Sequence, residues 1–328
     1  MNLLQKGSQK IKMERYDFAI IGGGGTGLAA AMYGARLGLK TIVYGYTHGT
    51  ELPIGGVITT TNIVENYPGF IKLSGHELAK KLEEHARTYD NVTIKNEKVE
   101  EINKVKGGYD IKTKKGNYVS KTILFATGTK WRELIVPGSK EFMNKGVHYC
   151  ALCDAPLYKN KVVSVVGGSD SAIKDALVLA EHAKKVYIIY RGEKIRPEPV
   201  NMMRVEAKKN VEIINNTNIT EIKGTKFVES VILDKPYKGK KELELDGVFV
   251  AIGHIALSDL AVKLGVKVDK KNEIIINHAT SETSVPGVFA AGDVTDKQFK
   301  QLITGVADGC TSAYSAYEYI NKERVMTD

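Results

Sequence analysis

Two cysteines and an acid form the segment whose residue types most directly indicate chemistry, Cys150-Ala151-Leu152-Cys153-Asp154. Cysteines three positions apart can share one helical turn, so their sulfurs can close and open a disulfide with little backbone movement. The carboxylate that follows can pass a proton as the dithiol forms and breaks. The segment therefore predicts a redox-active disulfide between Cys150 and Cys153, with Asp154 as its acid/base.

Metal binding is the first alternative for these cysteines. A zinc site needs a second pair of ligands, but Cys310 stands alone and the seven histidines show no ligand spacing to it. We therefore expect no metal. A buried cysteine pair without chemistry is the second alternative, and Cys310 itself is expected to be a small buried residue.

A glycine-rich turn near the start of the chain predicts a dinucleotide site. Gly22, Gly24 and Gly27 lie between a β-rich run at 16–21 and an alanine-rich run at 28–37, and a further strand should follow. In such a strand-turn-helix-strand unit the glycines allow a tight turn, backbone approach to a pyrophosphate and close helix packing. The anion then rests on the helix N-terminus.

The same pattern occurs a second time, at residues 167–172. A strand at 161–166 precedes it, and a helical stretch to His182 and a strand at 185–190 follow. Ser169 replaces the middle glycine of the second copy, which is tolerable because serine is small. A glycine-rich turn without a ligand is the alternative for each copy, but the repetition favours two dinucleotide sites and electron transfer between two cofactors.

The remaining segments complete two α/β units. Strands are expected at 109–113, 118–125, 211–213 and 227–233, and a buried parallel strand within 247–253. A helix from about Ile303 to Asn321 should close the chain. The length of 328 residues also predicts about two domains, at roughly 150 residues per domain.

Composition excludes several classes of protein. The hydrophobic fraction of 43% and the charged fraction of 26% fit a globular chain, and no apolar run is long enough to cross a membrane. The net charge is +9, but the basic residues are scattered through turns without interleaved aromatics, so we expect no nucleic-acid partner. The first dozen residues lack the apolar core of a secretion signal, and three cysteines are too few for a secreted framework, which predicts a cytoplasmic location.

In the order of its motifs the chain resembles the low-molecular-weight thioredoxin reductases of bacteria and archaea. The resemblance covers nearly all of residues 16–319, and its specificity lies in the order and spacing of the motifs together. The matching segments are 22–27, 55–56, 59–61, 65–69, 126–128, 150–154, 167–172, 251–254, 290–293 and 300–301.

The resemblance implies a fold of two Rossmann-like, three-layer ββα domains, with the NAD(P)H-binding domain inserted into the FAD-binding domain. The expected parts are a flexible tail at 1–13, FAD-binding segments at 14–130 and 245–328, and an NAD(P)H-binding domain with the CxxC at 131–244. It also implies a homodimer whose domains rotate against each other, with the linkers 131–137 and 242–246 as hinge candidates.

Roles are carried over by the same resemblance. Cys153 is then the sulfur nearest the flavin, and Cys150 attacks the disulfide of a thioredoxin or thioredoxin-like partner. Asp293 is implied to bond the ribityl chain, with Thr59, Asn66 and Gln301 along the flavin. The FAD-binding residues implied are Gly22, Gly24, Gly25, Thr26, Gly27, Gly55, Gly56, Thr59, Asn66, Thr127, Gly128, Gly292, Asp293, Lys300, Gln301 and Leu302. Those implied for NADPH are Gly167, Gly168, Ser169, Asp170, Ser171, Ala172, Arg191 and Arg196.

The NADPH motif departs from the family pattern, HRRxxxR. Arg191 and Arg196 are kept, whereas Tyr190 stands at the histidine and Gly192 at the second arginine. Each lost charge-assisted hydrogen bond is worth roughly 1.5 to 3 kcal/mol, so NADPH affinity should fall. Another electron donor, such as NADH, ferredoxin or a deazaflavin, is therefore the alternative, although Lys194 restores some charge.

Plainer interpretations stay open for several residues. Residues 59–61 are also good strand formers, and 66–69 would make an adequate turn by themselves. Asp293 would also serve as the N-cap of a following helix. Arg191, Lys194 and Arg196 would equally suit a solvated basic loop. A binding protein with a purely structural flavin is the alternative of a different class.

Overall fold

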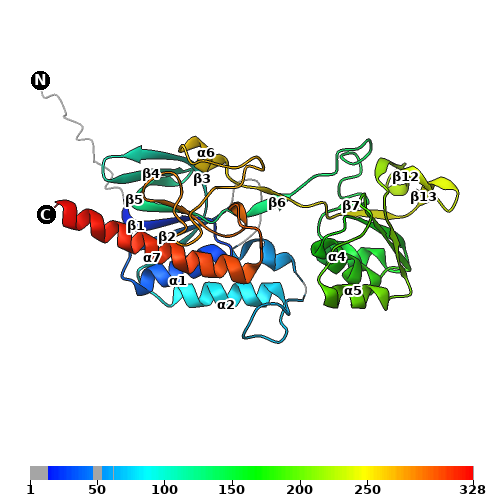
Figure 1. The fold of residues 1–328 in the computed structure, drawn as a ribbon, viewed down its shortest axis with the longest axis horizontal. Coiled ribbons are helices and arrows are strands. Elements are labelled where there is room, and N and C mark those ends of the chain that lie inside the picture. The colour runs from blue at the N-terminus through cyan, green and yellow to red at the C-terminus, as the bar shows by residue number, and fades with distance from the viewer. Residues whose placement is uncertain (1–13, 47–53, 62, 328) are drawn as a thin grey trace, which may run out of the picture. The chain divides into compact units, whose positions relative to one another are not determined.

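The computed structural model describes residues 14–46, 54–61 and 63–327, so the tail expected at 1–13 lies outside the described residues. The chain divides into two compact units (Figure 1). Unit 1 consists of the described residues up to Thr129 and from Ala256 onward, and unit 2 is the continuous segment Lys130–Ile255. Each unit combines a parallel sheet with helices, so the α/β fold class expected from the sequence is confirmed.

The sheet of unit 1 has a parallel part in the order β3-β2-β1-β5-β16, and β3, β4 and β5 continue as an antiparallel meander. Helices α1, α2 and α7 lie together on one face of the parallel part (Figure 1). The elements of unit 1 are β1 (Glu14–Ile21), α1 (Gly25–Arg36), β2 (Thr41–Tyr46), the short 3-10 helix η1 (Gly56–Thr60), α2 (Gly75–Arg87), β3 (Val92–Val105), β4 (Gly108–Thr113), β5 (Gly116–Phe125), α6 (Asp259–Lys263), β16 (Val288–Ala290), the 3-10 helix η3 (Gly292–Val294) and α7 (Leu302–Thr327).

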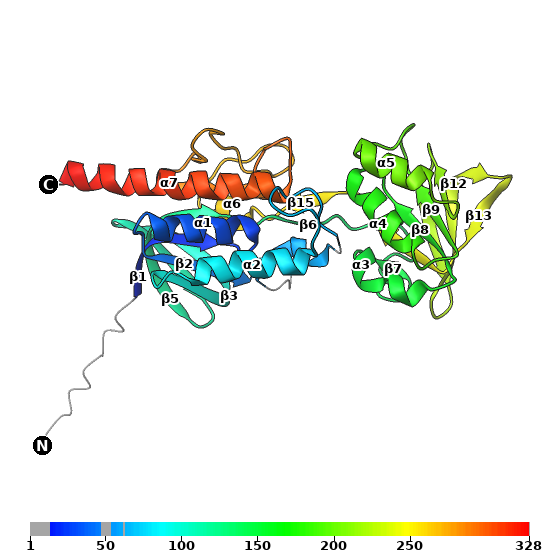
Figure 2. The same ribbon diagram turned by 90° about the horizontal axis from the view of Figure 1, so that it is seen from below.

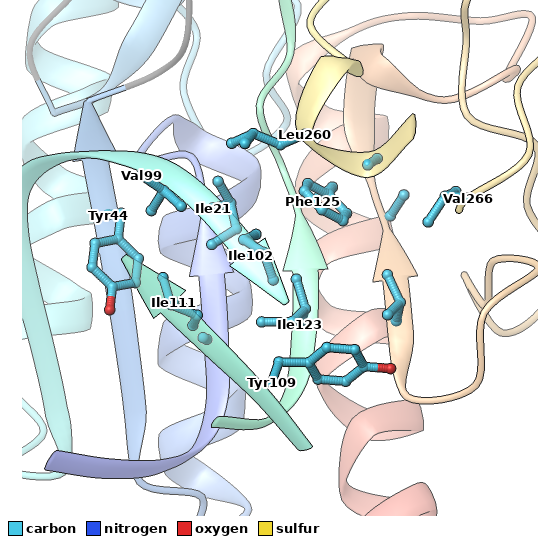
Figure 3. Close-up of a cluster of buried hydrophobic side chains, with 14 of the residues drawn as sticks. Ile21, Tyr44, Val99, Ile102, Tyr109, Ile111, Ile123, Phe125, Leu260 and Val266 are labelled. Atoms are coloured by element: carbon cyan, nitrogen blue, oxygen red, sulfur yellow. The ribbon is translucent and has the colours of Figure 1, made fainter. Parts of the chain in front are cut away.

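Side chains of β1 pack on both faces of this sheet, because neighbours along a strand point in opposite directions. Phe18 and Ile20 are fully buried in a cluster with Leu28 of α1. Ile21 belongs to a second cluster with Ile111 of β4, on the meander side (Figure 3). Unit 1 therefore has three layers, with the parallel sheet in the middle.

Unit 2 repeats this architecture around a sheet whose five strands are parallel, in the order β10-β9-β8-β14-β7. Helices α4 and α5 lie on one side of this sheet, and the meander β11-β12-β13 lies on the other (Figure 2). Its elements are β7 (Val147–His148), α3 (Ala151–Asp154), the 3-10 helix η2 (Ala155–Tyr158), β8 (Val162–Val166), α4 (Asp170–Ala180), β9 (Lys185–Ile189), α5 (Pro199–Glu206), β10 (Val211–Ile214), β11 (Ile219–Gly224), β12 (Val228–Tyr237), β13 (Lys240–Glu244) and β14 (Gly247–Val250).

The chain passes between the units at β6 (Thr129–Trp131) and β15 (His254–Ala256), which pair with each other. The second division falls between Ile255 and Ala256, later than the boundary expected at Leu245. The reason is that β14 pairs with β7 and β8 in the sheet of unit 2.

Two local expectations also change. Residues 59–61, considered as possible strand formers, lie in and directly after η1 instead. Asp293, considered as an N-cap, lies inside η3, whose N-cap position is Ala291. Among the described residues no helix is long and apolar enough to span a membrane.

Candidate active site and nucleotide sites

Cys150 and Cys153 form a disulfide, as the sequence predicted, with their Cα atoms 5.4 Å apart. Cys150 is the N-cap residue of α3, and its Sγ accepts a hydrogen bond from the backbone N–H of Cys153 at 3.2 Å. Cys153 is exposed and Cys150 is half-buried. The short helix therefore holds both sulfurs within one turn, and in the dithiol form its N–H can stabilise a thiolate on Cys150.

Asp154 ends α3 and contacts a histidine that sequence reasoning did not single out. The Oδ2 atom of Asp154 lies 3.0 Å from Nδ1 of His148, on β7. The Nε2 atom of that histidine lies 2.7 Å from the hydroxyl of Tyr158, on η2. The only signal for this contact in the sequence was proximity, because His148 precedes the CxxC by two positions.

His148 is buried among rings, with a relative exposure of 6%. Its imidazole stacks on Phe249 at 5.2 Å and meets the ring of Tyr158 edge-on at 5.4 Å. Burial lowers the pKa of His148, although the nearby Asp154 carboxylate acts in the opposite direction. Burial, reinforced by Asp154 and Asp246, raises the pKa of Tyr158 to about 12. His148 and Tyr158 are therefore both neutral near pH 7.

The first glycine turn fits a dinucleotide. A Cβ on Gly22 would lie 2.2 Å from the carbonyl oxygen of Ala126, and one on Gly27 would lie 1.9 Å from that of Gly22. At Gly24, in contrast, the nearest atom would be 3.8 Å away. The two outer glycines thus serve the turn and helix packing, while the middle one leaves space for close backbone approach by a pyrophosphate. Gly24 caps α1 without a side-chain hydrogen bond, so the helix N-terminus remains open to an anion.

Residues expected along FAD contact one another, or this turn, from distant parts of unit 1. The backbone N–H of Gly55 donates to Gly23 at 2.8 Å, and Nδ2 of Asn66 donates to Gln301 at 3.0 Å. Lys300 holds η3 in place through bonds from its Nζ to the carbonyl oxygens of Asp293, at 2.9 Å, and Thr295, at 2.7 Å.

Close approaches also join the two parts of unit 1. A Cβ on Gly25 would meet Leu302 at 2.5 Å, and one on Gly292 would meet the hydroxyl of Thr26 at 2.7 Å. The Thr127 hydroxyl is already used, because it donates a hydrogen bond to the carbonyl oxygen of Leu257 at 2.7 Å. Gly25 and Thr26 at the start of α1 thus lie close to Leu302 and Gly292 from the C-terminal part of unit 1.

The second glycine turn differs, because an aromatic ring lies on it. A Cβ on Gly168 or on Gly192 would lie 2.6 Å from ring atoms of Tyr190. The backbone N–H of Arg196 donates to Gly168 at 2.7 Å, which closes residues 190–196 onto the turn. Arg191 and Arg196 are both exposed. The basic residues and the turn are thus close, but the Tyr190 ring fills the space beside Gly192.

No group of three or more metal-ligating side chains occurs in the part of the chain that the structure describes. Cys310, in α7, is half-buried, and burial raises the pKa of its thiol. The disulfide between Cys150 and Cys153 is the observation that favours the redox interpretation.

Comparison with known proteins gives the family. The model of the pyridine nucleotide-disulphide oxidoreductases matches residues 16–309. This chain belongs to that family. It is an oxidoreductase of the flavoprotein type with a redox disulfide, and membership implies FAD and a pyridine nucleotide as its cofactors.

The relatives include several thioredoxin reductases. A thioredoxin reductase of Treponema pallidum is 35% identical over 93% of this chain and 97% of its own length. An alkyl hydroperoxide reductase protein of Pseudomonas aeruginosa is 34% identical over 94% of this chain, which spans only 58% of that protein.

Solved structures agree in fold. The thioredoxin reductase of Lactococcus lactis has a TM-score of 0.87 at 33% identity, covering 94% of this chain and 99% of that one. That of T. acidophilum has a TM-score of 0.86 at 36% identity, covering 93% and 98%. A ferredoxin-flavin thioredoxin reductase of Clostridium acetobutylicum, at 34% identity, has a TM-score of 0.50 and covers 94% and 99%. The resemblance seen in the motifs is therefore confirmed.

Proposed function

We propose that the protein is a thioredoxin-disulfide reductase, which passes electrons from NADPH through FAD and the Cys150–Cys153 pair to the disulfide of a thioredoxin or thioredoxin-like protein. The observation that carries the proposal is the disulfide at the N-terminus of α3, beside Asp154, in a chain that matches thioredoxin reductases over almost its whole length. We further propose that it works as a cytoplasmic homodimer, with FAD in unit 1 and the pyridine nucleotide in unit 2.

The FAD site is proposed at the first glycine turn. Gly22, Gly24 and Gly27 would hold the pyrophosphate, and the open N-terminus of α1 would face its charge. Asn66 and Gln301, which already bond each other, would lie along the flavin. Bound FAD supplies the two-electron redox centre between nucleotide and disulfide.

The dithiol step assigns one task to each residue of the CxxCD segment. The Cys150 thiolate attacks the partner's disulfide, supported by the N–H that already points at its sulfur. Cys153 then attacks Cys150 and releases the reduced partner. Asp154 gives and takes the protons, since its carboxyl is partly exposed beside the pair, at 27%.

A different electron donor is the second candidate, and Tyr190 is the observation that favours it. An arginine at position 192 would have its Cβ 2.6 Å from the ring of Tyr190, which itself lies against Gly168. The ring therefore takes the place from which a second arginine could reach a 2′-phosphate. NADH or reduced ferredoxin would not need that arginine.

Anaerobic titration of the yellow protein tests both candidates. NADPH, NADH and reduced ferredoxin are added in turn while flavin bleaching is followed, and oxidised thioredoxin is then added. Bleaching by micromolar NADPH, reversed by thioredoxin, is the result expected of the first proposal. Bleaching by another donor alone, with the same reversal, would support the second.

A Cys153→Ser protein should lose thioredoxin reduction, and Cys310→Ser should retain it. A Cys153→Ser protein that reduced thioredoxin at the parent rate would refute the dithiol mechanism.

A further inference from the structure

His148 has a set of contacts that no step above uses. Its Nδ1 atom is buried and has no hydrogen-bond partner among the described residues apart from the Asp154 carboxylate, 3.0 Å away. Its Nε2 atom is within 2.7 Å of the Tyr158 hydroxyl. The imidazole thus bridges a buried phenol and the acid of the disulfide segment.

The hydrogen-bond direction follows from the protonation states. Tyr158 keeps its proton near pH 7, because burial raises its pKa to about 12, so its hydroxyl can donate to Nε2 of His148. A neutral imidazole that accepts at Nε2 carries its proton on Nδ1. That proton faces Oδ2 of Asp154. The hydrogen bonds therefore run from the Tyr158 phenol to the His148 imidazole and on to the Asp154 carboxylate.

Few other ionisable groups face the hydrogen-bonded residues Tyr158, His148 and Asp154. Lys161 lies 5.9 Å from the centre of the Tyr158 ring, and Asp246 influences the same phenol. The β14 side is apolar, with Phe249 stacked on the imidazole. On α3 the remaining ionisable groups are the two cysteines, which titrate only in the dithiol form.

We propose that His148 is a positioning residue that shares with Asp154 the proton taken from the attacking thiol, so that the pair can deliver it to the sulfur leaving the substrate disulfide. This inference rests on the proposed dithiol function. The proton can reside on either partner, because Nδ1 of His148 and Oδ2 of Asp154 lie 3.0 Å apart. Tyr158 fixes the imidazole so that Nδ1 faces the carboxylate.

The step balances without a further reagent. The Cys150 thiol passes its proton to the Asp154–His148 pair, the resulting thiolate forms a bond to one substrate sulfur, the substrate S–S bond breaks, and the leaving sulfur takes that proton from the pair. Cys153 then passes its thiol proton to the pair and bonds to Cys150, and the second substrate sulfur leaves with that proton. The two protein thiols thus lose two electrons and two protons, and the substrate disulfide gains both. The pair ends in the protonation state in which it began.

The test compares two disulfides that differ in their need for an acid. The holoprotein is reduced with dithiothreitol, desalted, and mixed in a single turnover with the aromatic disulfide 5,5′-dithiobis(2-nitrobenzoate) or with 2-hydroxyethyl disulfide. An aromatic thiolate is weakly basic and leaves without a proton, whereas an aliphatic thiolate needs one. His148→Gln should therefore slow only the aliphatic reaction, by about 10-fold at pH 7, and change the shape of its pH profile. Tyr158→Phe should show a smaller effect of the same kind.

Controls separate the possible failures. Ser164→Ala removes a buried hydroxyl of β8 in the same sheet and should leave both reactions unchanged. Adding His148→Gln to Asp154→Asn should bring little further loss, because the two side chains act as one unit. Equal slowing with both disulfides, or no slowing with either, would overturn the role of His148 while the dithiol function stands. A parent protein inert toward both disulfides and toward oxidised thioredoxin would instead refute the proposed function.

Discussion

Two aspartates of unit 2 have different surroundings, and their carboxylates therefore have different roles. Asp154 is partly exposed and contacts a buried histidine. Asp170, at the start of α4, is held by three donors: Nζ of Lys174, the backbone N–H of Glu198 and Nδ2 of Asn201, each at 2.8 Å. The first arrangement leaves a carboxylate able to exchange protons, whereas the second fixes a charge and ties α4 to α5.

The fixed charge of Asp170 should contribute to stability in a pH-dependent way. Burial alone would raise the pKa of Asp170, but the bonds from Lys174, Asn201 and Glu198 outweigh it and hold the pKa below its ordinary value. The carboxylate therefore stabilises the fold above its unfolded pKa, and this stability is lost as pH falls through the lower folded pKa.

Asp170→Asn should accordingly lower the free energy of unfolding by about 1–2 kcal/mol at pH 7. The difference from the parent should shrink below about pH 4, where the carboxyl takes up a proton. Urea denaturation at several pH values measures it, with the exposed Asp90→Asn as the control. A difference that stayed constant down to pH 3 would contradict the ionic explanation.

At the scale of elements, the segment between β9 and α5 should determine nucleotide choice. The Tyr190 ring lies against both Gly168 and Gly192, so these residues form one packed set. Gly192→Arg alone should therefore improve NADPH use little. Adding Tyr190→His should release the arginine, because imidazole lacks the ring carbon and hydroxyl that lie 2.7 and 2.8 Å from the position of the new Cβ.

For the double variant we expect NADPH affinity to rise about 10-fold, which corresponds to one added charge-assisted hydrogen bond. Anaerobic titration of flavin bleaching measures the change. NADH is the control, because it lacks the 2′-phosphate and its affinity should not change. An equal gain with the single variant, or a matching gain with NADH, would show that Tyr190 does not restrict this site.

At the scale of the whole molecule, the sequence predicted the two repeated units because each glycine turn must join a strand to a helix. It also predicted the disulfide, since cysteine spacing is local information. It did not predict α2, although the capping box of Ser74 and Glu77 marks its start. The second division of the chain was placed too early, because the pairing of β14 with β7 is a long-range property. His148 was missed because only the fold brings its ring to Asp154.

Unit 2 has its own apolar clusters on both faces of its sheet, and its two ends are close together. The backbone N–H of Arg132 donates to the carbonyl oxygen of Gly253 at 2.9 Å, so the excised segment would start and end at one place. A fragment of residues 130–255 should therefore unfold cooperatively and form the Cys150–Cys153 disulfide.

The complementary chain, with 130–255 replaced by a short glycine-serine linker, should bind FAD and be yellow, whereas the fragment should be colourless. Visible absorption and circular dichroism during thermal unfolding of both proteins measure this. The full-length chain, purified in parallel, is the control for flavin content. A yellow fragment, or a colourless but folded complement, would contradict the assignment of FAD to unit 1, because the Asn66–Gln301 and Lys300–Asp293 contacts would then serve another ligand.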